Sequence, residues 1–546
     1  MHGLMMDYPL TIQAILARAE RMYGHKRIIS QLTDKSRHEY TYADMGQRVR
    51  TLASALTKLG VRPGDRVATL CWNHYWHVEA YFAVPAMGAV LHTLNLRLHH
   101  TDLEYIINHA GDRVIIVDDI LLPLLEPLRG KIPCVEHILV VPTKGKKIDQ
   151  GIDYEEAMDG ADGSQVRWPD LDEQTAAAMC YTSGTTGRPK GVMYSHRSIA
   201  LHSMGCGIYD TLGLREGDIA CPVVPMFHAN AWGLPHACGL FGSTQVLPGP
   251  HLDPPSLLEL FVREKVTLTA GVPTIWLGIL QLLDADPGKY DLSSLRAMVV
   301  GGSAAPVSMI KGFRERHNLD VIHAWGMTET CPLGTVCYVP SSKSKASEEE
   351  KYKERAKQGM PAPYVEIRAR SENGIVEWNG NDMGELEVRG PWVAASYYNN
   401  PEAATSFTHD GWFKTGDIVS IHPNGCIQIQ DRAKDVIKSG GEWISSVELE
   451  NAIMGHPAVA EAAVVAAFHP KWAERPLACV VLRQGKTCSA SEVREYLAER
   501  FAKWWLPDAV VFVSEIPRTS AGKFLKSKLR DEFKDYLATT ASADEE

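Results

Sequence analysis

The sequence has little that would point to export, to a membrane or to a metal-stabilised fold. Its 11 cysteines include no CxxC pair, and the amino terminus has no basic segment followed by an apolar stretch. We therefore expect neither a disulfide framework, nor a zinc site, nor a secretory signal. No apolar run reaches the about 18 residues of a membrane span. These absences predict a cytoplasmic globular protein.

Positive charge is also scarce. The chain has 56 Lys and Arg against 66 Asp and Glu, a formal net charge of -10. That balance disfavours a general nucleic-acid binder, because phosphate neutralisation needs a surplus of Lys and Arg. Small anionic ligands stay possible, since a few local lysines suffice for them.

At 546 residues the chain exceeds the size at which one hydrophobic core usually stops growing, so at least two domains are expected. Over the first 360 or so residues, helical patterns alternate with short apolar runs. The pattern predicts a helix at 102–110 and strands at 114–117, 176–181, 266–270 and 297–300. This alternation predicts an α/β fold with a mainly parallel sheet covered by helices, whose ligand loops follow the strand ends.

The pattern changes twice toward the carboxyl terminus. Residues 341–357 are charged and predict a solvated loop or helix. Alternating strands at 365–368, 385–388 and 426–429 then predict a β-rich subdomain at about 360–432. Beyond it, capping boxes at 445–448 and 489–492 begin two predicted helices, strands are expected at 462–467, 477–482 and 510–513, and a terminal helix at 525–537. We expect a large domain at 1–432 and a small α+β domain at 433–546.

The strongest local signal is the loop that follows the strand at 176–181. It contains three glycines, four hydroxyl side chains and a lysine: Thr182, Ser183, Gly184, Thr185, Thr186, Gly187, Lys190 and Gly191. Glycine permits positive φ, so several N–H groups can point into one concavity, and the other side chains add donors that suit phosphate oxygens. The P-loop pattern GxxxxGK[ST] does not occur. Most Gly/Ser/Thr tracts are flexible surface loops, but the length and order of this one favour phosphate binding.

This tract resembles the phosphate loop of the adenylate-forming superfamily of acyl-CoA synthetases, luciferases and peptide-synthetase adenylation domains. Further segments resemble the motifs of that superfamily in the same order: Trp325–Glu329, Thr415–Asp417, Asp431–Asp435 and Pro517–Lys523. The segments Pro225–Trp232 and Lys438–Ser446 are most similar to those of bacterial medium- and long-chain fatty-acid:CoA ligases. The resemblance covers nearly the whole chain.

The resemblance implies an AMP-forming acyl-CoA ligase that uses ATP, Mg²⁺ and coenzyme A. First a carboxylate attacks the α-phosphate and pyrophosphate leaves; then the thiol of coenzyme A attacks the acyl carbon and AMP leaves. The small domain would turn about a hinge near Lys434 between the two steps. It would present Lys523 for adenylation and Lys438 for thioester formation.

The same resemblance assigns the nucleotide and metal residues. Thr185 and Glu329 would hold Mg²⁺, which prefers hard oxygen ligands, and Thr328 would touch the α-phosphate. Asp417 and Arg432 would hold the ribose. The pocket wall would comprise Gly302, Ser303, His323, Ala324, Trp325 and Gly326, with Trp325 stacking on adenine where the superfamily usually has tyrosine. The coenzyme A segment would comprise Gly441, Glu442 and Trp443, and Lys471, Trp472 and Arg475 would either touch its nucleotide or form an exposed basic patch.

The acyl channel would be bordered by His228, Ala231, Trp232, Gly302 and Gly326, with Trp232 as its gate in long-chain members. No acidic residue stands between Pro222 and His236, which disfavours amino acids as substrates. Three alternatives stay open: the same chemistry on a short or functionalised acid such as 3-methylmercaptopropionate or an aryl acid, a luciferase-like oxygenase, and a non-catalytic nucleotide-binding relative. The resemblance also implies a homodimer, and a lipid substrate would permit loose membrane association.

Overall fold

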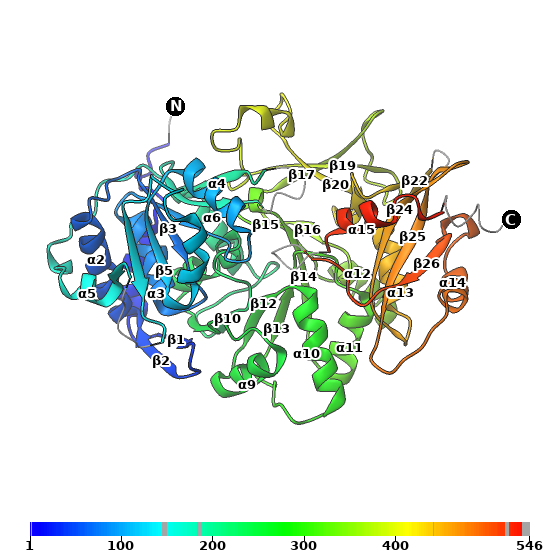
Figure 1. The fold of residues 1–546 in the computed structure, drawn as a ribbon, viewed down its shortest axis with the longest axis horizontal. Coiled ribbons are helices and arrows are strands. Elements are labelled where there is room, and N and C mark those ends of the chain that lie inside the picture. Colours follow the sequence, from blue (N-terminus) through cyan, green and yellow to red (C-terminus); the bar gives the residue numbers. More distant parts are fainter. Residues whose placement is uncertain (2, 145–149, 183–187, 440–441, 519–523, 538–546) are drawn as a thin grey trace.

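A computed structural model describes residues 1, 3–144, 150–182, 188–439, 442–518 and 524–537, with Glu442 and Trp443 described by their main chain alone (Figure 1). Within these ranges the strands form four sheets. Two large sheets make up the first 360 or so residues, a smaller antiparallel sheet follows, and a fourth sheet lies at the carboxyl terminus. The α/β fold class is confirmed.

The seven-stranded sheet has the order β7-β6-β5-β3-β4-β8-β9 and is parallel except between β8 and β9. Apolar residues alternate between its faces, so each face packs against its own helices. The strands and their neighbouring helices are α2 (Tyr42–Lys58), β3 (Arg66–Leu70), α3 (Tyr75–Ala86), β4 (Val90–Thr93), α4 (His100–Ala110), β5 (Asp112–Asp118), β6 (His137–Val141), β7 (Ile152–Asp153), α5 (Tyr154–Asp159), β8 (Ala176–Tyr181) and β9 (Gly191–Ser195).

The nine-stranded sheet has the order β16-β15-β14-β13-β12-β10-β11-β1-β2, parallel from β14 to β1 and antiparallel at both edges. One face packs against α9, α10 and α11, and the other shares a core with α1, α6, α8 and the first sheet. The bounds are α1 (Ile12–Tyr23), β1 (Arg27–Gln31), β2 (Arg37–Thr41), α6 (His196–Gly207), β10 (Ile219–Pro222), α7 (Ala229–Trp232), α8 (Leu234–Phe241), β11 (Thr244–Leu247), α9 (Pro254–Glu264), β12 (Leu268–Gly271), α10 (Pro273–Ala285), β13 (Ala297–Val300), α11 (Val307–His317), β14 (Val321–Gly326), β15 (Leu333–Val336) and β16 (Met360–Pro361).

The predicted β-rich stretch forms an antiparallel sheet of order β18-β17-β19-β20-β21. Its strands are β17 (Glu366–Ser371), β18 (Gly374–Ile375), β19 (Met383–Arg389), β20 (Phe413–Ile421) and β21 (Ile427–Arg432). The charged segment before it is helical over α12 (Glu348–Arg355), which buries Tyr352 and Glu354. The segment was predicted as a solvated loop or helix; the helix is present, but Tyr352 and Glu354 on its inner face are not solvated.

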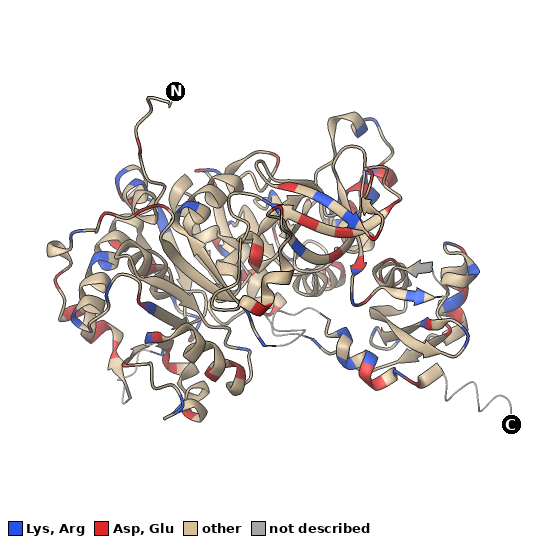
Figure 2. Cartoon of the chain, turned by 90° about the horizontal axis from the view of Figure 1, so that it is seen from above, with Lys and Arg blue, Asp and Glu red and all other residues tan. Residues whose placement is uncertain are grey.

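The carboxyl-terminal sheet has the order β23-β22-β25-β24, with β26 beside β25, and packs against helices of its own. Along the chain, Lys and Arg residues lie among Asp and Glu residues (Figure 2). Its elements are β22 (Ile437–Ser439), β23 (Glu442–Ile444), α13 (Ser446–Met454), β24 (Val459–His469), β25 (Ala473–Leu482), α14 (Ala490–Ala498), β26 (Ala509–Phe512) and α15 (Lys526–Phe533). The predicted capping box at Ser489 is complete. At Ser445 only half of one forms, because Glu448 accepts a hydrogen bond from Gln428 instead. The domain limits at 432 and 433 stay a prediction.

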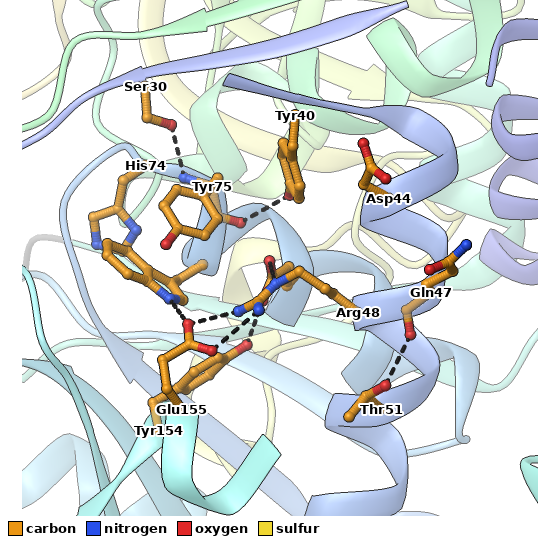
Figure 3. Close-up of polar contacts among 12 residues, drawn as sticks. Ser30, Tyr40, Asp44, Gln47, Arg48, Thr51, His74, Tyr75, Tyr154 and Glu155 are labelled. Carbon is orange, nitrogen blue, oxygen red and sulfur yellow. Dashed lines mark hydrogen bonds and ion pairs between the residues drawn. The ribbon is translucent and has the colours of Figure 1, made fainter. Parts of the chain in front are cut away.

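A partly buried polar network joins the helices of the first sheet (Figure 3). Arg48 of α2 pairs with Glu79 of α3 at 2.6 Å and with Glu155 of α5 at 2.7 Å. Tyr154 also donates a hydrogen bond to Glu79 over 2.7 Å. Burial raises the pKa of Glu79, while Arg48 favours its charged form. None of these side chains lines the cavity described below, so the network fixes the packing of α2, α3 and α5. Among the described residues, no helix has both the length and the apolar character that crossing a membrane requires.

Candidate active site

A cavity of about 1150 Å³ opens where the large sheets, the β-rich sheet and the carboxyl-terminal segment approach one another. Three parallel strands, β8, β13 and β14, end at it, as expected for ligand loops of an α/β fold. Residues from motifs as far apart as Thr182 and Lys434 therefore share one space. The sequence-predicted residues that line it are Thr182, Lys190, His228, Trp232, Gly302, Ala324, Trp325, Gly326, Thr328, Glu329, Arg432 and Lys434.

Other predicted residues do not line the cavity. His323 and Ala231 are buried behind its wall, and His323 contacts the Ala356 carbonyl oxygen through Nδ1 at 3.0 Å. Burial lowers the pKa of His323 to about 4. Ser303 is exposed, and Lys438 projects from β22, where its main-chain N–H donates to Glu474 at 2.8 Å. Several predicted positions lie outside the described residues: Ser183, Gly184, Thr185, Thr186, Gly187, Gly441 and Lys523.

The base of the phosphate loop is closed by two hydrogen bonds between its ends. The Thr182 N–H donates to the Lys190 carbonyl oxygen over 3.0 Å, and the Lys190 N–H donates to Thr182 Oγ1 over 3.1 Å. The Lys190 ammonium lies 4.8 Å from the ring centroid of Tyr397. The loop thus leaves β8 and returns to β9 with its lysine at the cavity.

Glu329 is a buried carboxylate at the cavity wall. Its side chain is only 5% exposed, and Oε1 accepts a hydrogen bond from the Tyr397 hydroxyl over 2.6 Å. Burial, followed by the charge of Glu329, raises the pKa of Tyr397, which keeps the phenol a donor. Sequence reasoning missed Tyr397, which lies in a loop and in none of the motifs recognised. Within the described ranges Glu329 Oε2 accepts no hydrogen bond, so a hard oxygen ligand fit for Mg²⁺ remains available.

Thr328, next to Glu329, is held by its main chain. Its carbonyl oxygen accepts a hydrogen bond from the Tyr194 hydroxyl over 2.6 Å. Thr328 itself lines the cavity. Gly326 allows the neighbouring chain to approach, because a Cβ there would lie 1.9 Å from the Pro332 carbonyl oxygen.

The predicted ribose residues form an ion pair. Asp417 of β20 faces Arg432 of β21, and Asp417 Oδ1 lies 2.8 Å from Arg432 Nε. Asp417 Oδ2 accepts a hydrogen bond from the Trp325 indole N–H over 2.9 Å. Arg432 lines the cavity, whereas Asp417 is 2% exposed and does not line it. The pair therefore reaches the cavity through Arg432. Trp325 thus has a second task that the sequence did not reveal.

The apolar end of the cavity is lined by Cys206, Leu212, Val299 and Leu333. Trp232 stands beside it, and a Cβ on Gly301 would lie 3.0 Å from the Trp232 ring. The residues of α7 all have positive φ, from 42° at Ala229 to 55° at Trp232, so this turn is left-handed. L-residues rarely adopt that conformation, and strain of this kind gathers at functional sites. The lining residues are scattered in sequence, which is why no motif predicted them.

The carboxyl-terminal part reaches the cavity through Phe524 and Lys434. Phe524 follows Lys523 and pairs with Arg518 in an isolated β-bridge. Burial lowers the pKa of Lys434, which stands at the predicted hinge. This arrangement brings the base of the predicted adenylation lysine segment to the cavity, whereas Lys438 does not line it.

A buried charged cluster ties the predicted hinge to α13 and α15. The Lys526 ammonium lies 2.6 Å from Glu450 Oε1 and donates to Ser446 Oγ over 2.6 Å. Ser446 in turn donates to Asp431 Oδ2 from Oγ over 2.5 Å. Burial raises the pKa of Glu450 to about 7, while Lys526 opposes that rise. Asp431 precedes Lys434 and its partners follow it, so the cluster spans the predicted hinge.

Arg475 does not belong to an exposed basic patch. It is 7% exposed and pairs with Asp508 at 2.8 Å. It also donates to Ser439 Oγ over 3.1 Å and to the Leu506 carbonyl oxygen over 3.1 Å. The expectation of an exposed patch is wrong for this residue, because its donors are already used inside the small sheet. Lys471 and Trp472 are exposed.

Comparison with known families identifies the chain. Residues 16–398 match the AMP-binding enzyme family, and residues 448–523 match the AMP-binding enzyme C-terminal domain. The chain therefore belongs to the AMP-binding enzyme family, and the resemblance to the adenylate-forming acyl-CoA synthetases is confirmed.

Two curated relatives align over nearly their whole length. A long-chain-fatty-acid–CoA ligase of Thermus thermophilus is 51% identical, with 97% of each chain covered. A 3-methylmercaptopropionyl-CoA ligase of Ruegeria lacuscaerulensis is 45% identical, covering 98% of this chain and 100% of the relative. Among solved structures, an anthranilate CoA ligase in complex with anthranoyl-AMP superposes with a TM-score of 0.86 at 26% identity, covering 97% of this chain and 99% of the other.

Proposed function

We propose that this chain is an AMP-forming fatty-acid:CoA ligase. It joins a carboxylate to the AMP part of ATP with release of pyrophosphate, and then transfers the acyl group to the thiol of coenzyme A with release of AMP. One observation carries this proposal: the same cavity holds a polar half, with Lys190, Thr328, Glu329 and Arg432, and an apolar half. The first half suits a nucleoside triphosphate and the second an acyl chain.

The polar half accounts for adenylation. Lys190 and the phosphate loop bind the triphosphate, and Asp417 with Arg432 holds the ribose. Glu329 and Thr185 would hold Mg²⁺, which when bound neutralises triphosphate charge. Lys523 stabilises the negative charge that builds on the α-phosphate, a contribution worth roughly 3 to 4 kcal/mol for a well-placed donor.

Thioester formation uses the other face of the small domain. The turn about Lys434 withdraws Lys523 and brings Lys438, Gly441, Glu442 and Trp443 toward the cavity. The bridge between Phe524 and Arg518, with Phe524 at the cavity, supports the view that the described arrangement is the adenylating one. We further propose that the enzyme is a cytoplasmic homodimer.

The apolar lining supports a fatty acid as substrate. Cys206, Leu212, Val299 and Leu333 offer an alkyl chain a wall without charge. The names of the relatives favour two substrate types, a long-chain fatty acid and 3-methylmercaptopropionate. The short thioether acid is the second candidate, since the cavity would also accept a shorter apolar group.

The test follows the two half-reactions separately. Pyrophosphate release and thioester formation are measured with ATP, Mg²⁺, coenzyme A and a ladder of straight-chain acids, beside 3-methylmercaptopropionate and benzoate. We expect both products, with an optimum among medium or long chains. Lys523→Ala should lose pyrophosphate release, and Lys528→Ala, an exposed lysine of α15, should not. Pyrophosphate without thioester for every acid would show that coenzyme A is not the acceptor.

A further inference from the structure

The segment that carries Tyr397 is hydrogen-bonded to both walls of the polar half-cavity. The Ala394 N–H donates to the Glu329 carbonyl oxygen over 2.8 Å, and the Tyr398 N–H donates to the Gly191 carbonyl oxygen over 2.8 Å. Gly191 begins β9, directly after Lys190. The segment therefore fixes the distance between the metal-side carboxylate and the lysine of the phosphate loop.

Tyr397 itself contacts both functional groups. Its hydroxyl donates to Glu329 Oε1 over 2.6 Å, and its ring face lies 4.8 Å from the Lys190 ammonium. The ring packs edge-on against Phe407 and Phe413, with centroids 5.7 and 6.4 Å away. A ring held on this side by two aromatic neighbours has little freedom to rotate away from Glu329.

We propose that Tyr397 is a positioning residue for the binding of a divalent cation with the triphosphate. It occupies one oxygen of Glu329 and turns the other toward the cavity, and it holds Lys190 beside that oxygen. The proposal rests on the proposed function, since it needs a nucleoside triphosphate in this cavity. Replacing a group that orients a ligating side chain typically lowers metal affinity by about 10- to 100-fold.

Tyr397 therefore affects cation binding and triphosphate binding through two different parts of its side chain. The hydroxyl serves the cation, because it donates to the Glu329 carboxylate. The ring serves the triphosphate itself, because its face lies against the Lys190 ammonium. Tyr397→Phe removes the first contact and keeps the second, whereas Tyr397→Leu removes both.

The experiment measures ATP affinity of the purified full-length chain by isothermal titration, once with Mg²⁺ in excess and once with EDTA. For Tyr397→Phe we expect affinity with Mg²⁺ to fall about tenfold and affinity in EDTA to stay within about twofold. For Tyr397→Leu we expect affinity in EDTA to fall also, by about threefold. Tyr398→Phe is the matched control, because its ring packs on His109, 5.7 Å away, and no contact joins it to Glu329.

Three other results would contradict either the role of Tyr397 or the proposed function. If Tyr397→Phe keeps the wild-type ratio between the two affinities, Tyr397 does not orient Glu329. If both affinities and the melting temperature of Tyr397→Phe fall together, its role is only structural. If the wild-type chain shows no ATP binding that depends on Mg²⁺, the proposed function fails before the variants are compared.

Discussion

Trp325 donates its indole N–H to Asp417 Oδ2 over 2.9 Å, while Arg432 pairs with the other oxygen of the same carboxylate at 2.8 Å. Asp417 is 2% exposed, so each of these partners offsets part of the cost of burying its charge. The residue expected to stack on adenine therefore also holds the carboxylate expected to bind ribose. The proposed recognition of the nucleotide therefore depends on both residues.

Replacing Trp325 by phenylalanine separates these two tasks. Trp325→Phe keeps an aromatic face but leaves Asp417 Oδ2 without its donor, and a hydrogen bond to a charged group contributes about 1.5 to 3 kcal/mol. We expect KM for ATP in pyrophosphate release to rise about tenfold or more. Trp378→Phe, an exposed tryptophan between β18 and β19, is the control. An unchanged KM for ATP would mean that the indole N–H does not support Asp417.

The cluster around Lys526 leads to a prediction about stability. Lys526→Met leaves Glu450 buried without its cation, and breaking a buried ion pair from one side costs about 3 to 5 kcal/mol. We expect a lower urea midpoint, measured by tryptophan fluorescence, and no such change in Lys528→Met on the exposed side of the same helix. Adding Glu450→Gln should restore part of the loss, because the carboxylate that paired with Lys526 is then replaced by a neutral amide. A double variant that is simply additive would contradict the pairing.

The sequence was most informative where residue type and position act locally. The strands predicted at 176–181 and 297–300 have the same bounds as β8 and β13 in the structure. The box at Ser489 also formed, since both of its bonds lie within one helix turn. At Ser445 the expected box competes with Gln428 of β21, a partner 20 residues from Glu448 that no local pattern shows.

In the candidate site too, residues in local motifs were predicted, whereas contacts between distant segments were missed. Motif residues such as Lys190 and Glu329 were predicted to act together, and the fold brings them to one cavity. Tyr397, which connects them, was not found, because its role depends on the path of a loop 68 residues after Glu329. The apolar lining was also missed, since Cys206 and Leu333 come from a helix and a strand that meet only in the folded chain.

Replacing Arg475 tests whether this residue stabilises the fold or binds coenzyme A. Its guanidinium is enclosed by Asp508 and the main chain near Leu506, so Arg475→Met leaves Asp508 unpaired. We expect a loss of about 1 to 3 kcal/mol in the free energy of unfolding, because Asp508 stays partly in contact with water. KM for coenzyme A, measured at a temperature where the variant is folded, should stay unchanged. A raised KM with unchanged stability would instead place Arg475 at the coenzyme A nucleotide.

His202 predicts how stability depends on pH. It is fully enclosed, its Nε2 accepts a hydrogen bond from the Leu333 N–H over 3.2 Å, and burial lowers its pKa from 6.5 to about 3. In the unfolded chain this histidine takes up a proton below about pH 6.5, whereas in the folded chain it stays neutral. The unfolded state then binds more protons, so the stability that His202 contributes is present above pH 6.5 and is lost as the pH falls toward 3.

The measurement compares urea unfolding of the wild type with His202→Gln, in which an amide oxygen can still accept from Leu333. Between pH 6 and pH 4 the wild type should lose about 1.4 kcal/mol per pH unit more than the variant, the value for one proton. His25→Gln, at an exposed histidine, should follow the wild type. If the slopes of wild type and His202→Gln are equal, His202 is protonated in the folded state as readily as in the unfolded one. The hydrogen bond from Leu333, which needs an unprotonated Nε2, would then be lost on acidification without unfolding, and the apolar wall at Leu333 would move before the core does.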